Sequence, residues 1–114
     1  MAKHVFVVMT NATGNRDAEF NKWYDNQHIP DVLRVPGFVA AQRFKISDAQ
    51  LGDAKSQWKY LALYELETDN PAASLKELQA RLGTPAMVMS ETLDMSNLGA
   101  FMFTAIGDRV TAKK

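Results

Sequence analysis

The chain has 114 residues, of which 46% are hydrophobic and 23% charged, and its 13 basic residues balance its 13 acidic ones. A zero net charge argues against binding to nucleic acid or to an anionic membrane, both of which need a basic excess, and it favours self-association. The absence of cysteine excludes disulfides, thiolate nucleophiles and thiolate metal ligands. The early apolar run at 5–9 is too short for a signal peptide or a membrane span, so we expect a cytoplasmic protein. The length predicts a single domain at 1–110 and a frayed tail at 111–114.

The first half of the chain predicts a strand, a helix and a second strand. The first strand is β-branched and aromatic and is apolar on both faces, so we expect both faces to be covered. Asn15 can cap the helix, and acidic residues in the first turn suit the helix dipole. Because the residue before a proline avoids the α region, the helix should break or kink at Ile29 and Pro30. The expected ranges are 4–9 for the first strand, 16–28 for the helix, 31–35 for a short second helical piece and 38–46 for the second strand.

The second half predicts a strand, a helix and a last strand. Trp58 begins a strand whose even-numbered residues share one face. Asn70 as the cap, Pro71 at the first helical position and Gly83 after the last turn delimit the helix. The expected ranges are 58–66, 71–82 and 98–106. The order β-α-β-β-α-β predicts an α+β protein of the ferredoxin-like arrangement, with a four-stranded antiparallel sheet.

The uncovered face of this sheet indicates how the protein assembles. Two helices can cover one face of a four-stranded sheet, whereas the predicted strands carry apolar residues on both faces. An open apolar face would be larger than the few hundred Å² that monomers usually expose. A second copy of the same sheet is the simplest cover, so we expect a homodimer.

The densest group of chemically capable residues lies at 20–30. Phe20, Tyr24 and His28 are four residues apart and share one helix face, with Trp23 beside them. A histidine can exchange a proton near neutral pH without a cofactor, and a phenol can donate to a developing oxyanion. The alternative interpretation is that Tyr24 and His28 form a satisfied core pair or a helix-end cap.

Three residues outside this stretch are further candidates. His4 shares a strand face with Phe6, and it is either a substrate-binding group or a strand-end histidine in contact with water. Arg43 could anchor a substrate carboxylate, or it could form an ion pair with Glu65 on the neighbouring strand. The two histidines show no metal-binding spacing, and glycine-rich phosphate or dinucleotide motifs are missing from the sequence. We therefore expect no metal and no other cofactor.

The stretch 19–44 resembles a known family. Glu-Phe-Asn-Lys-Trp-Tyr-Asp-Asn-Gln-His-Ile-Pro, followed by Val-Pro-Gly-Phe and Gln-Arg-Phe, is similar to the EthD-like branch of the dimeric α/β-barrel superfamily. The specific part is the box Trp-Tyr-x-x-x-His-x-Pro and the Pro-Gly-Phe that follows it. The resemblance implies ferredoxin-like protomers whose sheets pair face to face into a dimeric α/β barrel. It also implies a pocket between sheet and helices in each protomer.

The resemblance further implies chemistry on small molecules. The superfamily includes lactone isomerases, polyketide cyclases and cofactor-free monooxygenases, which act on aromatic-derived or polyketide-like compounds. His28 matches the histidine of the box, which acts in the lactone isomerase, and His4 resembles the first-strand histidine of plant polyketide cyclases. The lactone isomerase has a second-strand tyrosine where this chain has Ala41, a departure from that enzyme's pattern.

We therefore expect a cofactor-independent enzyme that transfers protons on a small aromatic-derived, lactone or polyketide-like metabolite, as an isomerase, cyclase or lyase. The alternatives are a cofactor-free monooxygenase and a non-catalytic small-molecule-binding or stress protein. The expected roles are general acid/base for His28, oxyanion donor for Tyr24, apolar walls for Phe6 and Trp23, and orientation of a polar substrate group for His4 or Arg43.

Overall fold

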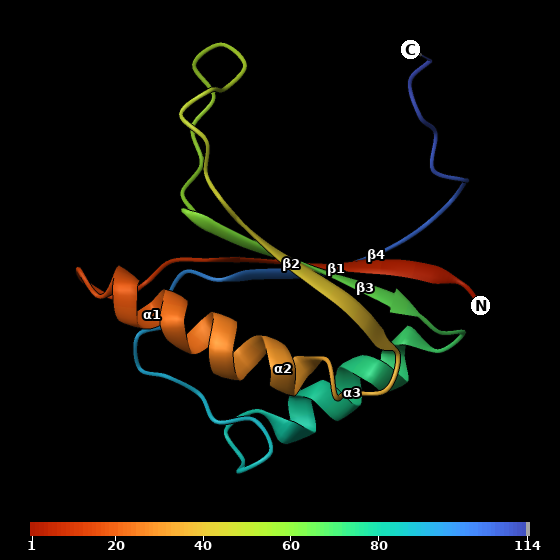
Figure 1. Ribbon diagram of the computed structural model, residues 1–114, viewed down its shortest axis with the longest axis horizontal. Coiled ribbons are helices and arrows are strands. Elements are labelled where there is room, and N and C mark those ends of the chain that lie inside the picture. Colours follow the sequence, from red (N-terminus) through yellow and green to blue (C-terminus); the bar gives the residue numbers. More distant parts are fainter. Residues whose placement is uncertain (114) are drawn as a thin grey trace.

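The computed structural model describes residues 1–113 and has the ferredoxin-like α+β fold that the element order predicts. The four strands form one antiparallel sheet in the order β2-β3-β1-β4. In Figure 1 the helices lie on one side of this sheet. The elements are β1 (Lys3–Thr10), α1 (Asp17–Trp23), the π-helical segment η1 (Tyr24–His28), α2 (Ile29–Val32), β2 (Phe38–Lys45), β3 (Tyr60–Glu67), α3 (Pro71–Arg81) and β4 (Gly99–Thr104).

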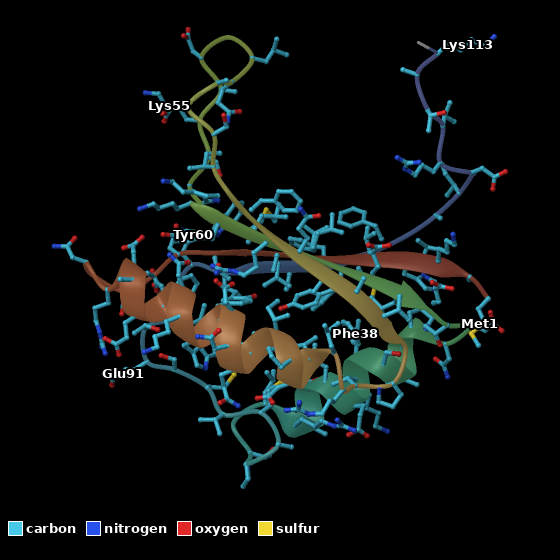
Figure 2. The ribbon with its side chains drawn as sticks, in the orientation of Figure 1. Met1, Phe38, Lys55, Tyr60, Glu91 and Lys113 are labelled. Carbon is cyan, nitrogen blue, oxygen red and sulfur yellow. The ribbon has the colours of Figure 1, made fainter. Side chains whose placement is uncertain are left out.

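The sheet has a face covered by the helices and an open face. Alternation along β3 places Tyr60, Ala62, Tyr64 and Leu66 against the helices, where all four are buried. On the opposite face, large apolar side chains remain exposed. The hairpin segment between β2 and β3 and the tail after β4 both extend on this open side (Figure 1), and Lys55 lies in the hairpin segment, below its tip, in Figure 2.

The start of the first helix differs from the prediction. Arg16, and not Asn15, occupies the N-cap, and no side chain caps the helix there. Arg16 instead forms ion pairs with Glu19, at 2.7 Å, and with Glu91, at 2.9 Å. The contact with Glu91 ties the start of α1 to the loop before β4, and the helix starts one residue later than expected.

Of the break or kink expected at Pro30, the break is wrong. Ile29 has αR dihedrals (φ −56°, ψ −51°), and the chain stays helical from Asp17 to Val32. The irregularity takes the form of the π-helical turn at Tyr24–His28. A proline lacks an N–H and crowds the carbonyl four residues earlier, and a wider turn ahead of Pro30 accommodates both effects.

The second half agrees more closely with its predicted signals. The Asn70 side chain accepts from the backbone N–H of Ala73, Pro71 begins α3, and Gly83 follows the helix with φ +80°. β3 begins at Tyr60, two residues later than expected, and Trp58 lies before the strand, where its indole N–H donates to the carbonyl of Asn97 at 3.1 Å. β4 is shorter than expected, Gly99–Thr104.

Two further expectations concern the tail of the chain and membrane-spanning segments. The frayed tail at 111–114 stays a prediction, and its last residue, Lys114, lies outside the described residues. Within residues 1–113, none of the helices has the length and apolar character that a bilayer crossing requires.

Candidate functional site

A cavity of about 130 Å³ lies on the helix side of the sheet. Phe6 and Val8 of β1 and Tyr64 of β3 contribute its sheet wall. Tyr24 and His28 of η1 contribute the helical wall. Further apolar side chains come from α2, α3, β4 and the loop between α3 and β4. The label Glu91 marks this loop in Figure 2. The cavity therefore collects side chains from both halves of the chain.

The π-helical turn positions the two predicted catalytic residues beside each other. The rings of Tyr24 and His28 have centroids 5.0 Å apart and are nearly perpendicular, at 87°. Trp23 stacks on His28 with centroids 4.8 Å apart, and its indole N–H donates to the carbonyl of Val88 at 3.1 Å. π-helical turns are often found at functional sites. Trp23 does not line the cavity, and its contribution is to pack its ring against the ring of His28.

His28 is buried without a hydrogen-bond partner for Nδ1 in the described part of the chain. Burial lowers the pKa of the ring from 6.5 to about 4, because the imidazolium loses its hydration, and the charge of Asp31 offsets part of this effect. At neutral pH the imidazole is therefore uncharged and keeps a lone pair that can accept a proton. A buried polar atom without a partner is rare in folded proteins and often belongs to a functional site.

The two buried tyrosines of the cavity form a hydrogen-bonded pair. The Tyr64 hydroxyl donates to the Tyr24 hydroxyl at 3.3 Å. Burial raises the pKa of Tyr24, and it raises that of Tyr64 well above its usual value. Both phenols therefore keep their protons at neutral pH. Because Tyr64 is the donor within the pair, the proton of Tyr24 is available to a ligand.

Arg43 lies outside the cavity. Its guanidinium stands 4.4 Å from the centroid of the Tyr24 ring and donates to Asp25 at 2.9 Å and to Asn21 at 2.8 Å. The alternative prediction, an ion pair between Arg43 and Glu65, is wrong. In the strand register Arg43 is opposite Ala62, on the helix side, and Glu65 is on the other face.

His4 also lies apart from the cavity, and both of its ring nitrogens have partners. Nε2 donates to the carbonyl of Thr68 at 2.9 Å. In the neutral ring Nδ1 then accepts from the Thr104 hydroxyl, also at 2.9 Å. The structure therefore brings Phe6, Tyr24 and His28 together at the cavity and leaves His4 outside it.

Two residues of the site escaped the sequence prediction. Tyr64 joins Tyr24 across the cavity, and its even-numbered place in the third strand was a usable signal for a helix-facing side chain. Asp31 is 2% exposed, accepts from Gln27 at 2.8 Å and pairs with Arg34. Its burial had no local sequence signal, because acidic residues in a first helical turn are usually solvated.

Metal-ligating side chains do not gather at this site. Within residues 1–113, no three His, Asp or Glu side chains are placed to hold one metal ion together. The polar groups that the cavity offers are two phenols, one imidazole and the Thr10 hydroxyl. These groups suit hydrogen bonding and proton transfer.

A family model matches most of this architecture. Residues 3–81, which run from β1 to the end of α3, match the family described as Domain of unknown function (DUF4286). The chain belongs to this family. The matched region includes Tyr24, His28 and Tyr64, whereas the loop that closes the cavity and β4 lie beyond it.

A curated fungal relative matches part of the chain. Core atranone cluster (CAC) protein 1 from Stachybotrys chlorohalonatus (strain IBT 40285) is 39% identical over 51 residues, which is 45% of this chain. The alignment spans 20% of the length of that relative.

Solved structures of similar shape share the fold at low sequence identity. The heme-degrader MhuD from Mycobacterium tuberculosis, solved with two hemes in its active site, has a TM-score of 0.61 and 14% identity over 94% of this chain and 99% of its own. A candidate monooxygenase from Shewanella loihica PV-4 has a TM-score of 0.58 and 12% identity over 95% and 99%. These two likenesses establish the fold and confirm the ferredoxin-like architecture that the EthD-like resemblance implies. An EthD family protein from Bacillus halodurans C-125 aligns at 16% identity over 96% and 100%, with a TM-score of 0.49.

Proposed function

We propose that this protein is a cofactor-independent enzyme that transfers a proton on a small aromatic-derived, lactone or polyketide-like molecule. The observation that carries the proposal is the pairing of His28 and Tyr24 in one apolar cavity. The imidazole is uncharged and lacks a partner for Nδ1, and the phenol retains a proton to donate. With ring centroids 5.0 Å apart, both groups can contact one small molecule. Two proteins of the same fold lend support. One is described as a heme-degrader with two hemes bound in its active site, and the other as a candidate monooxygenase.

The chemistry follows from the charge states of His28 and Tyr24, an unprotonated imidazole and a protonated phenol. The lone pair of His28 takes a proton from a carbon next to a carbonyl group, and the electron pair of the broken C–H bond moves onto the carbonyl oxygen. Tyr24 donates a hydrogen bond to this oxyanion. An imidazolium with a pKa of about 4 is a strong acid, so it returns the proton quickly. Where a carbon–carbon double bond is conjugated with the enolate, return of the proton to the far end of that double bond, two carbons away, shifts the double bond and is an isomerisation. Attack by the carbanion on a second carbonyl carbon of the same molecule breaks the π bond of that carbonyl, its oxygen takes the proton from His28, and the result is a cyclisation.

Proton exchange measures this activity without knowledge of the natural substrate. The purified protein is incubated in D₂O with a panel of butenolides, cyclic ketones and hydroxylated aryl ketones, and deuterium uptake is followed by mass spectrometry. We expect His28→Asn to slow exchange by about 10²–10⁴, the usual contribution of a positioned acid or base. Tyr24→Phe should slow it by about 10²–10³, the usual effect of losing an oxyanion donor.

The matched control is His4→Asn, which removes the other imidazole of the chain, at a position outside the cavity. Exchange that survives His28→Asn in a folded protein, or is lost only in His4→Asn, would contradict the assignment. Circular dichroism and a thermal melt verify that each variant is folded. An oxygen electrode in the same assay tests the second candidate, a cofactor-free monooxygenase, which predicts substrate-dependent oxygen uptake. Tight binding without exchange or uptake across the panel would indicate a binding protein.

We also propose that the protein is a homodimer formed through the open sheet face. Phe44 is 45% exposed, and Phe101 and Phe103 are each 55% exposed. The strand register places them on the open face, because Phe44 pairs with Leu61, Phe101 with Val7 and Phe103 with Val5. Exposed aromatic side chains spread over an apolar sheet face are typical of a protein interface. The zero net charge of the chain supports association with a second copy.

A further inference from the structure

The cavity carries no formal charge at neutral pH. Ten of its fourteen lining residues are apolar, and the other four are Thr10, Tyr24, His28 and Tyr64. No Asp, Glu, Lys or Arg is among them in the described chain. The four polar residues are uncharged as well, because burial keeps both phenols protonated and the imidazole unprotonated.

The two charged residues that act on Tyr24 and His28, Arg43 and Asp31, are already paired. Arg43 contacts the Tyr24 ring from outside the cavity and donates to both Asp25 and Asn21. Asp31, whose charge is felt by His28, is held by Gln27 and Arg34. A carboxylate or phosphate that entered the cavity would therefore lose part of its hydration without gaining a counterion among the lining residues. Such a transfer is unfavourable.

The polar groups suit one oxygen atom of a ligand. The Tyr24 hydroxyl is 3.3 Å from the Tyr64 hydroxyl, and the Tyr24 ring lies against the ring of His28, so a ligand oxygen at Tyr24 would lie near all three side chains. The remaining surface is mostly aliphatic and thioether, from α2, α3 and the loop before β4. The volume of about 130 Å³ is close to that of apolar cavities of about 150 Å³ that hold benzene.

We infer that this cavity takes an uncharged, mainly apolar molecule of about one ring, which presents a single carbonyl or hydroxyl oxygen to Tyr24 and His28, and that it rejects carboxylates and phosphates of the same shape. The inference rests on the proposed site and specifies its substrate class. It also assigns Arg43 no contact with substrate, in contrast to the carboxylate anchor that the sequence suggested.

A pair of probes of equal shape and different charge tests this selectivity. Benzamide and benzoate are titrated into the full chain at about pH 7 by isothermal calorimetry, with acetophenone as a second neutral probe. We expect both neutral probes to bind and benzoate to bind at least about 100-fold more weakly, because an unpaired buried charge costs several kcal/mol. Benzoate binding as tightly as benzamide, or failure of both neutral probes to bind, would overturn the inference.

A cavity-filling variant localises the binding. Ala100 lines the cavity from β4, so Ala100→Leu should abolish binding of the neutral probes while the protein stays folded in a thermal melt. Unchanged binding in that variant would place the probes elsewhere and overturn the inference. Calorimetry needs no turnover, so its result is separate from the proposed function. Selective binding of the neutral probes without proton exchange would support the inference and contradict the proposed enzymatic function. Proton exchange together with strong benzoate binding would support the proposed function and contradict the inference.

Discussion

The burial of His28 makes the stability of this fold depend on pH. The pKa of the folded ring is lowered to about 4, chiefly by desolvation, against 6.5 for an ordinary histidine. Between these values the unfolded chain binds a proton that the folded chain does not. The free energy of unfolding therefore falls as the pH falls through this range. The contribution is fully present above about pH 6.5 and is lost by about pH 4.

The size of the effect follows from the shift. A pKa lowered from 6.5 to about 4 corresponds to about 3.4 kcal/mol across the whole range, at about 1.36 kcal/mol for each pH unit. Between about pH 7.5 and pH 5 the expected loss is about 2 kcal/mol. The side chain is 8% exposed, so solvent screens little of this effect. A loss of this size is a large fraction of the stability of a small domain.

Urea denaturation at fixed protein concentration measures the loss. The wild type and His28→Gln are compared at about pH 7.5, 6 and 5, because glutamine keeps a polar side chain but does not titrate. We expect the free energy of unfolding of the wild type to fall by about 2 kcal/mol more than that of the variant over this range. Equal pH dependence in the two proteins would show that the ring is not desolvated in the folded state.

Two further predictions concern the open face and the turn before β2. Phe103→Asp, on the open face, should convert the dimer to a monomer in light scattering. The control is Leu33→Asp, which changes an exposed apolar residue beside α2 and should leave the mass unchanged. A wild-type protein that is monomeric at micromolar concentration would contradict the assembly. Gly37→Ala should lower the free energy of unfolding by about 2 kcal/mol, because Gly37 has φ +99° and a Cβ there would overlap the Ser74 hydroxyl. Gly107→Ala, which meets no atom within 4 Å, is its control and should be neutral in the same urea titration.

The parts of the fold that the sequence predicted correctly depend on local patterns. The even-numbered residues of β3 face the helices because side chains alternate along any strand. Asn70 and Pro71 delimit α3 because capping and the missing proline N–H act within one turn. The same local reasoning identified the shared face of Tyr24 and His28, which the structure places at one cavity.

The incorrect parts have two different causes, one local and one that depends on strand pairing. The residue before a proline avoids the α region in general, yet Ile29 is helical because the preceding π-helical turn makes room for Pro30. The side of the sheet on which Arg43 lies, and so its access to Asp25 on the helical side, depends on the register of β2 and β3. A bulge between Phe38 and Ala40 sets this register, and no pattern in the sequence marks it. Sequence spacing therefore indicated that Arg43 is partly buried but not which carboxylate it meets.

The two histidines show why burial alone does not identify a catalytic residue. His4 is 5% exposed and His28 is 8% exposed, so their burial is nearly the same. The partners of His4 come from residues 64 and 100 positions away in the chain, and they occupy both of its nitrogens. His28 has a buried nitrogen without a partner. A ligand oxygen that gains negative charge beside His28 would raise the pKa of the ring from about 4, so the base becomes stronger as the transition state forms. His4 has no free nitrogen with which to respond in this way.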